Sequence, residues 1–189
     1  MNSNIGKSIP NNTKYKEEEY LAPFLEHLRA ISQTIGPDES LIVYRTQHIV
    51  PVDEFGQTPN VLRARTGTGR KVSRKYTKEE VDNLSLEDRT TAVGKYGLSC
   101  NPTEEAAEAS FMNGYKKLLS KNPSKEEIDE FIRKRGEYIC RYILKNDIAT
   151  VTKFRNDHAN IYLYAGVNLE DCRDKTYEPR KINYQSYEE

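Results

Sequence analysis

The stretch YICRYILKNDIATVTKFRNDHANIYLYA, residues 138–165, contains three short runs that are rich in β-branched and aromatic residues. The runs 138–144, 148–154 and 160–165 predict three β-strands. A tight turn of Lys, Asn and Asp at residues 145–147 joins the first two strands. Because the strands follow one another with short links, the simplest arrangement is an antiparallel meander.

Helical patterns precede these strands along the chain. Apolar residues recur at three- and four-residue spacing between residues 20 and 35, which predicts an amphipathic helix that ends at Gly36. A second apolar face runs from residue 106 to 119, behind a cap at Asn101 or Thr103. A Ser or Thr followed by Glu three residues later marks two further helix starts, at Thr77 with Glu80 and at Ser124 with Glu127.

These patterns together predict an α+β fold. We expect a mostly antiparallel sheet, an N-terminal helix, two or three further helices and a long basic loop. A chain of 189 residues fits one domain. The predicted organisation is a disordered arm at residues 1–14, a single domain at 15–172 and a polar tail at 173–189.

Composition narrows the function classes. The formal net charge is zero, whereas a protein that coats nucleic acid generally would be basic over its whole surface. No apolar run approaches the roughly 20 residues of a membrane-spanning helix, and the N-terminus lacks an export-signal pattern, so we expect a cytoplasmic protein without a membrane partner. Cys100, Cys140 and Cys172 have neither disulfide-framework nor zinc-site spacing, and the three histidines are scattered, so we expect reduced cysteines and no metal.

A basic loop stands out in this neutral chain. Between Val61 and Tyr76 there are six cations, no carboxylate and two glycines, Gly67 and Gly69. Cations next to uncovered backbone N–H groups suit a phosphate or another anion. The loop lacks the spacing of a nucleoside-triphosphatase P-loop, and a solvated charged loop remains the alternative interpretation. The cations are Arg63, Arg65, Arg70, Lys71, Arg74 and Lys75.

Two strand residues are the other candidates for an anion site. Arg45 interrupts an apolar strand at Leu41 to Thr46, and burying an arginine there is costly unless an anion or a carboxylate meets it. Ser99 lies in the compact strand of residues 97–100, which leads directly into a capped helix, a geometry that suits a phosphate or carboxylate. A solvent-facing Arg45 and purely structural capping behind Ser99 remain open.

The order of these pieces resembles the ADP-ribosyltransferase-like group. In that family, an Arg on an early strand, a Ser or Thr segment on a later strand and a downstream Glu surround a nicotinamide dinucleotide. Residues 41–45 resemble the Arg strand, 97–99 the hydroxyl-bearing strand before a helix, and 137–144 a later strand. The resemblance spans roughly residues 41–165 through motifs of two or three residues each.

The resemblance implies NAD as a cofactor and, if the chain is an enzyme, ADP-ribosyl transfer. Arg45 would contact a phosphate or ribose, Ser99 would support the Arg strand, and a Glu would polarise the ribose hydroxyl to favour loss of nicotinamide. Glu137 and Glu170 lie near strand ends, and neither stands in a Gln-x-Glu or Glu-x-Glu pair. The expected catalytic residues are Arg45, Ser99 and Glu137, and the expected cofactor-binding residues are Arg45, Thr46, Arg65, Arg70 and Lys71.

Two alternatives belong to other function classes. The chain could be a non-catalytic binding module whose loop at residues 63–75 docks on nucleic acid or on an acidic protein partner, with salt-sensitive affinity. It could also be an accessory protein that works by shape, with its polar arms as partner contacts. The leading expectation is a domain that binds a nucleotide or another phosphate-bearing ligand.

Overall fold

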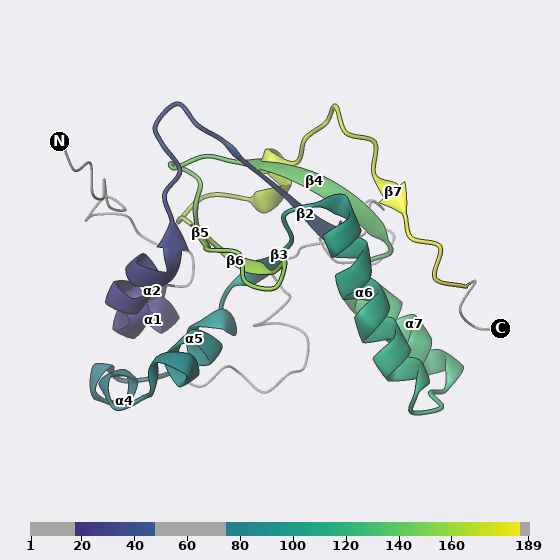
Figure 1. Ribbon diagram of the computed structural model, residues 1–189, viewed down its shortest axis with the longest axis horizontal. Coiled ribbons are helices and arrows are strands. Elements are labelled where there is room, and N and C mark those ends of the chain that lie inside the picture. Colours follow the sequence, from purple (N-terminus) through teal and green to yellow (C-terminus); the bar gives the residue numbers. More distant parts are fainter. Residues whose placement is uncertain (1–17, 48–74, 186–189) are drawn as a thin grey trace.

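The structure, a computed structural model, describes residues 18–47 and 75–185 (Figure 1). The predicted arm at residues 1–14 lies outside this part of the chain. So does the basic loop up to Arg74, including Arg65, Arg70 and Lys71. The described residues form helices and antiparallel sheets, which confirms the α+β class.

Two antiparallel sheets form the centre of the molecule. The four-stranded sheet has the order β1-β5-β6-β3, and the three-stranded sheet has the order β2-β4-β7. The strands are β1 (Ser32–Gln33), β2 (Leu41–Gln47), β3 (Leu98–Cys100), β4 (Tyr138–Leu144), β5 (Ala149–Thr152), β6 (Ala159–Leu163) and β7 (Arg180–Lys181).

The predicted antiparallel meander is confirmed for β5 and β6 but wrong for β4, which pairs with β2 and β7 instead of β5. The chain leaves one sheet after β4 and enters the other at β5. This change lets Tyr142 and Leu144 of β4 pack in one core with Val151 of β5 and Ile161 of β6. Burial of apolar faces between two sheets therefore outweighs the preference of sequential strands to pair.

Helices cover the outer faces of both sheets (Figure 1). The N-terminal helices and α4 and α5 pack on Tyr162 and Tyr164 beside β6, while α6 and α7 pack on Ile139 of β4. Side chains of β4 alternate between two cores, because successive residues of a strand point to opposite faces. Ile139 packs under α6, whereas Tyr142 packs in the core between the sheets. The helices are α1 (Glu18–Leu21), the 3₁₀ turn η1 (Ala22–Phe24), α2 (Leu25–Ile31), α4 (Lys78–Asp82), α5 (Leu86–Gly94), α6 (Glu104–Leu119) and α7 (Lys125–Arg135).

The predicted helix starts are confirmed, but the first helix ends earlier than predicted. Thr77 and Ser124 each form a complete capping box, and Thr103, not Asn101, caps α6. The N-terminal helix ends at Ile31 instead of residue 35, because the next two residues pair with β5 as β1. A tertiary strand pairing thus overrides the helical spacing.

The segment after β6 packs onto the three-stranded sheet. It forms the 3₁₀ turn η3 (Leu169–Cys172) and then β7, which pairs with β4. Ile182 is buried in the same core as α6, and Tyr184 packs against that core. Residues 173–185 of the predicted polar tail therefore contribute to the fold.

Candidate functional site

Among the described residues, one isolated backbone pair joins the two sheets, and Arg45 lies beside it. Tyr44 and Asn101 exchange hydrogen bonds of 2.9 and 2.8 Å between β2 and the end of β3. Backbone groups of an antiparallel strand point alternately to its two neighbours, so the Ser99 carbonyl, two residues before Asn101, also points toward β2. That carbonyl accepts a hydrogen bond of 2.9 Å from Nη1 of Arg45. An arginine side chain thus bridges the strands where the sheets diverge.

Arg45 lies over two buried cysteines. It stands opposite Cys140 in the register of β2 and β4, and Cys100 ends the neighbouring β3. Burial raises the pKa of the Cys100 thiol to about 12 and that of the Cys140 thiol to about 11, while the positive charge of Arg45 opposes both shifts. Both thiols therefore stay protonated at neutral pH, which excludes them as nucleophiles.

A chain of polar side chains connects this region to Glu170. The hydroxyl of Tyr142 donates to Oε1 of Gln47, and Nε2 of Gln47 donates to Oε2 of Glu170 at 2.6 Å. The other carboxylate oxygen of Glu170 pairs with Nε of Arg173 at 2.7 Å. Tyr142 and Gln47 are buried, whereas Glu170 reaches solvent with 37% of its side chain exposed.

Electrostatics place Arg45 and Glu170 in the same neighbourhood. Burial raises the pKa of the Tyr142 hydroxyl, the Arg45 charge opposes this shift, and the Glu170 charge adds to it. Both charged groups also act on the pKa of the Cys140 thiol, behind burial and the nearby Arg173. A guanidinium and a partly exposed carboxylate therefore flank the junction between the sheets.

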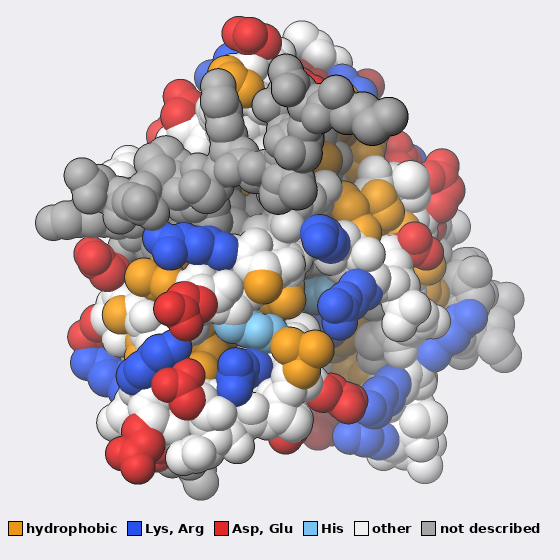
Figure 2. Space-filling view, turned by 60° about the vertical axis from the view of Figure 1, so that its left-hand side comes forward, with side chains coloured by type: hydrophobic (Ala, Val, Ile, Leu, Met, Phe, Trp, Pro, Cys, Tyr) orange, Lys and Arg blue, Asp and Glu red, His pale blue; other side chains and the backbone are white. Residues whose placement is uncertain are grey.

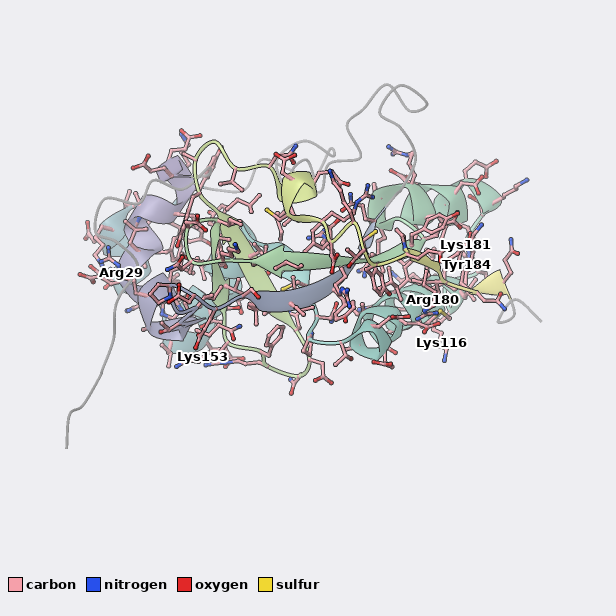
Figure 3. The ribbon with its side chains drawn as sticks, turned by 90° about the horizontal axis from the view of Figure 1, so that it is seen from above. Arg29, Lys116, Lys153, Arg180, Lys181 and Tyr184 are labelled. Atoms are coloured by element: carbon pink, nitrogen blue, oxygen red, sulfur yellow. The ribbon has the colours of Figure 1, made fainter. Side chains whose placement is uncertain are left out.

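Among the predicted site residues, Arg45 and Ser99 are brought together, and Glu137 is not. The carboxylate of Glu137 accepts a hydrogen bond of 3.0 Å from the Tyr184 hydroxyl and pairs with Nζ of Lys181 at 3.2 Å. Lys181 and Tyr184 lie beside β7, toward the C-terminal end of the described chain (Figure 3). Glu137 thus belongs to the packing of the C-terminal segment.

Thr46 lies on the other face of β2 from Arg45. Successive strand residues point to opposite faces, and Thr46 stands opposite Ile139, whose side chain packs under α6. It is half-buried and turned away from the cysteines. Thr46 and Arg45 therefore face different sides of the sheet.

Sequence reasoning missed Gln47 and Tyr142, which carry the polar chain to Glu170. The two residues are 95 positions apart, and only the pairing of β2 with β4 brings them together. The available signal was a Gln directly after an apolar strand, a position that tolerates a buried polar group only if it is hydrogen-bonded.

The basic loop is described only at its last cation. Lys75 pairs with Glu19 at 2.5 Å and lies over the Tyr20 ring, 5.2 Å from its centroid. Arg65, Arg70 and Lys71 lie outside the described residues. Binding of nucleic acid or an acidic partner through this loop therefore stays a prediction.

Within residues 18–47 and 75–185, no group of three or more His, Cys, Asp or Glu side chains could hold a metal ion. No helix in that part of the chain has the length and apolarity that crossing a bilayer requires. Comparison of the chain with family models, with curated proteins and with solved structures found no match.

Proposed function

We propose that the junction between the two sheets binds a nucleotide-like anion, and that the chain resembles ADP-ribosyltransferases in using NAD. The observation that carries the proposal is the hydrogen bond of 2.9 Å from Arg45 Nη1 to the Ser99 carbonyl. It joins the two strands that the resemblance names, 54 residues apart in the sequence. A half-buried guanidinium at the end of a sheet interface suits phosphate oxygens, because its fork of donors matches their geometry.

The residues at the junction would have distinct roles. Arg45 would donate to a phosphate or ribose oxygen, and Ser99 would hold the Arg45 side chain through its backbone carbonyl. NAD, when bound, supplies a ribosyl group with nicotinamide as the leaving group. Glu170, which approaches the same neighbourhood, would accept a hydrogen bond from a ribose hydroxyl. Both glutamates have side-chain partners, so their positions support the choice: Glu170 contacts Gln47 of the polar chain beside the junction, whereas Glu137 contacts Tyr184 and Lys181 near the C-terminal segment.

Calorimetric titration of the full chain with NAD tests the binding proposal. We expect measurable heat for the wild type and at least about tenfold weaker binding for Arg45→Ala, because a lost charge-assisted contact costs roughly 1.5 to 3 kcal/mol. Arg133→Ala is the matched control, since this arginine lies on α7 with 51% of its side chain exposed. A flat wild-type titration, or equal affinities for wild type and Arg45→Ala, would remove the proposal.

Nicotinamide release discriminates between the two glutamates. We expect Glu170→Gln to slow release from NAD by about 100-fold or more, as loss of a group that polarises a reacting hydroxyl does. Glu137→Gln is expected to retain more activity than Glu170→Gln. The reverse order would contradict the assignment of Glu170, and the absence of release in the wild type would leave a binding function without catalysis.

A further inference from the structure

A second cationic region lies at the opposite end of the molecule from α6 and α7. Its centre is His27 of α2, whose Nε2 is 3.1 Å from the Thr90 hydroxyl of α5. Burial lowers the pKa of His27, and the positive charges of Arg89 and Arg155 lower it further. The contact with Thr90 places α2 against α5, and the charges of Arg89 of α5 and Arg155 of the turn after β5 both act on the His27 imidazole.

Two more cations border this group. The Lys153 N–H donates to the Ile31 carbonyl at 2.9 Å, which holds Lys153 against the end of α2, and Arg29 is exposed on the same helix. Figure 3 shows Arg29 and Lys153 at the end of the molecule away from Lys116 and Lys181. We call this surface the His27 face; it consists of His27, Arg29, Arg89, Lys153 and Arg155.

Hydrogen bonds hold the turn that carries Arg155. Arg155 and His158 exchange backbone hydrogen bonds of 2.9 and 3.1 Å, and Asn156 and Asp157 have φ angles of 49° and 56° between them. Asn101 also donates from Nδ2 to the Asp157 carbonyl at 2.6 Å, which fixes the turn to the end of β3. The position of Arg155 relative to His27 is thus set by the fold.

The carboxylates next to the cations of the His27 face on α2 and α5 contact other groups: Glu26 pairs with Lys78, and Asp88 accepts a hydrogen bond from the Ser85 hydroxyl. The described ion pairs include Lys75 with Glu19 and Lys78 with Glu26 on the adjacent helices. Within the part of the chain that the structure describes, Arg29, Arg89, Lys153 and Arg155 form no ion pair; Arg89 donates instead to the Asp82 carbonyl at 2.8 Å. Asp157 is the one acidic residue between Lys153 and His158.

We propose that the His27 face binds the phosphate backbone of a nucleic acid. Four cations from three segments, α2, α5 and the turn after β5, supply local positive charge on a chain whose formal net charge is zero. Three of them are arginines, which match phosphate oxygens by their planar fork of donors. Figure 2 shows histidine atoms at the surface of this end of the molecule, with Lys and Arg side chains near them and hydrophobic, Asp and Glu side chains among these.

A phosphate backbone fits this face better than an acidic protein. Protein interfaces have an apolar centre, whereas interfaces with nucleic acid are mainly cationic and polar. The exposed large apolar side chains of the described residues are Ile42 and Leu86, and only Leu86 lies on an element of this face. Among the described residues, Leu86 is thus the one large exposed apolar side chain on the elements of this face, beside four cations. We therefore expect binding that depends on salt and little on base sequence.

The test measures binding of the full chain to a fluorescent 20-base-pair DNA duplex at several salt concentrations. The test variant is Arg29→Gln/Lys153→Gln/Arg155→Gln, whose three positions are exposed. The control is Lys117→Gln/Lys121→Gln/Lys125→Gln, which removes the same charge from exposed positions at the connection of α6 and α7. Thermal melting checks that both variants fold.

We expect the test variant to bind at least about tenfold more weakly than the wild type at low salt. Its slope of log affinity against log salt concentration should be shallower by about 2 to 3, because each lost phosphate contact removes about 0.9 from that slope. The control should retain the wild-type slope. Equal losses in both variants, an unchanged test variant or no wild-type binding would overturn the proposal. The proposal would also be overturned if the chain bound polyglutamate but not the duplex, and if the test variant lost the binding to polyglutamate.

Discussion

Gly136 connects α7 to β4 with a backbone conformation that favours glycine. Its φ angle is +74° and its ψ angle is 155°, and an added Cβ would lie 2.1 Å from the carbonyl carbon of Gln47. Gly166 also has a positive φ angle, of +83°, but an added Cβ would have no neighbour within 4 Å. Substitution of either glycine therefore introduces backbone strain, but only substitution of Gly136 also introduces steric overlap.

We predict that Gly136→Ala lowers the free energy of unfolding by about 3 kcal/mol or more, since strain and overlap add. Gly166→Ala should cost only about 1 kcal/mol, from conformation alone. Urea denaturation followed by circular dichroism measures both. Equal losses for the two variants would show that the close approach of Gly136 to Gln47 is absent.

The cysteines give a second prediction at this scale. Cys100 and Cys140 are buried, with pKa values raised by burial, while Cys172 is half-buried with a thiol whose pKa burial also raises. We predict that iodoacetamide at pH 8 modifies Cys172 first and leaves Cys100 and Cys140 protected until the protein is denatured. Peptide mass spectrometry locates the label. Rapid native labelling of Cys100 would contradict the burial of the Arg45 neighbourhood.

At the scale of elements, the C-terminal segment is held to α6 by Glu104. Its carboxylate accepts a hydrogen bond of 2.6 Å from the Tyr177 hydroxyl and a charge-assisted one from Nε of Arg180. Nη2 of Arg180 also donates to Glu108 at 2.7 Å. The Tyr177 hydrogen bond and then Arg180 lower the pKa of Glu104 below its ordinary value.

Because its pKa is lowered in the folded protein, the Glu104 carboxylate stabilises the fold fully at pH values above its ordinary pKa of 4.5. This stabilisation is lost as the pH falls from 4.5 through the lower pKa that Glu104 has in the folded protein. We predict that Glu104→Gln costs about 1 kcal/mol at pH 7, since Glu104 is 28% exposed, and that the difference from wild type shrinks as pH falls below the ordinary pKa of 4.5. Glu105→Gln, one residue away and exposed, is the control. A loss that is independent of pH would contradict the role of the charge.

The elements that the sequence predicts well are those with local signals. Capping boxes at Thr77 and Ser124 depend on residues three positions apart, and the apolar run of β2 is continuous. Strand pairing could not be predicted from local signals. β4 pairs with β2, which lies about a hundred residues away in the chain, and the neighbouring β5 belongs to the other sheet. The early end of the first helix has the same origin, a pairing of Ser32 with Thr152.

The candidate site was predicted only in part for the same reason. Arg45 and Ser99 were recognisable because an arginine in an apolar strand and a serine before a capped helix are unusual locally. The choice between Glu137 and Glu170 needed the tertiary structure, since the contact of Gln47 with Glu170 spans 123 residues. Long-range hydrogen bonds of this kind leave no periodic signal in a sequence.

At the scale of the whole molecule, two sheets with separate helical covers share one junction at Tyr44 and Asn101 (Figure 1). The cores on the two outer faces and the core between the sheets are distinct clusters, and Val43 of β2 and Cys100 of β3 beside the junction belong to the core between the sheets. Ligand sites commonly lie where packed layers diverge. The proposed nucleotide site and the His27 face occupy different parts of this architecture and can be tested separately.

Nuclear magnetic resonance with ¹⁵N-labelled full chain tests the central claim most directly, because it reports where a ligand binds. Stepwise addition of NAD should shift the Nε–H signal of Arg45 and the amide signals of Ser99 and Cys100, and leave the amides of α7 in place. Unchanged signals at Arg45 and Ser99 under saturating NAD, with or without shifts elsewhere, would contradict the proposal that this junction is the binding site.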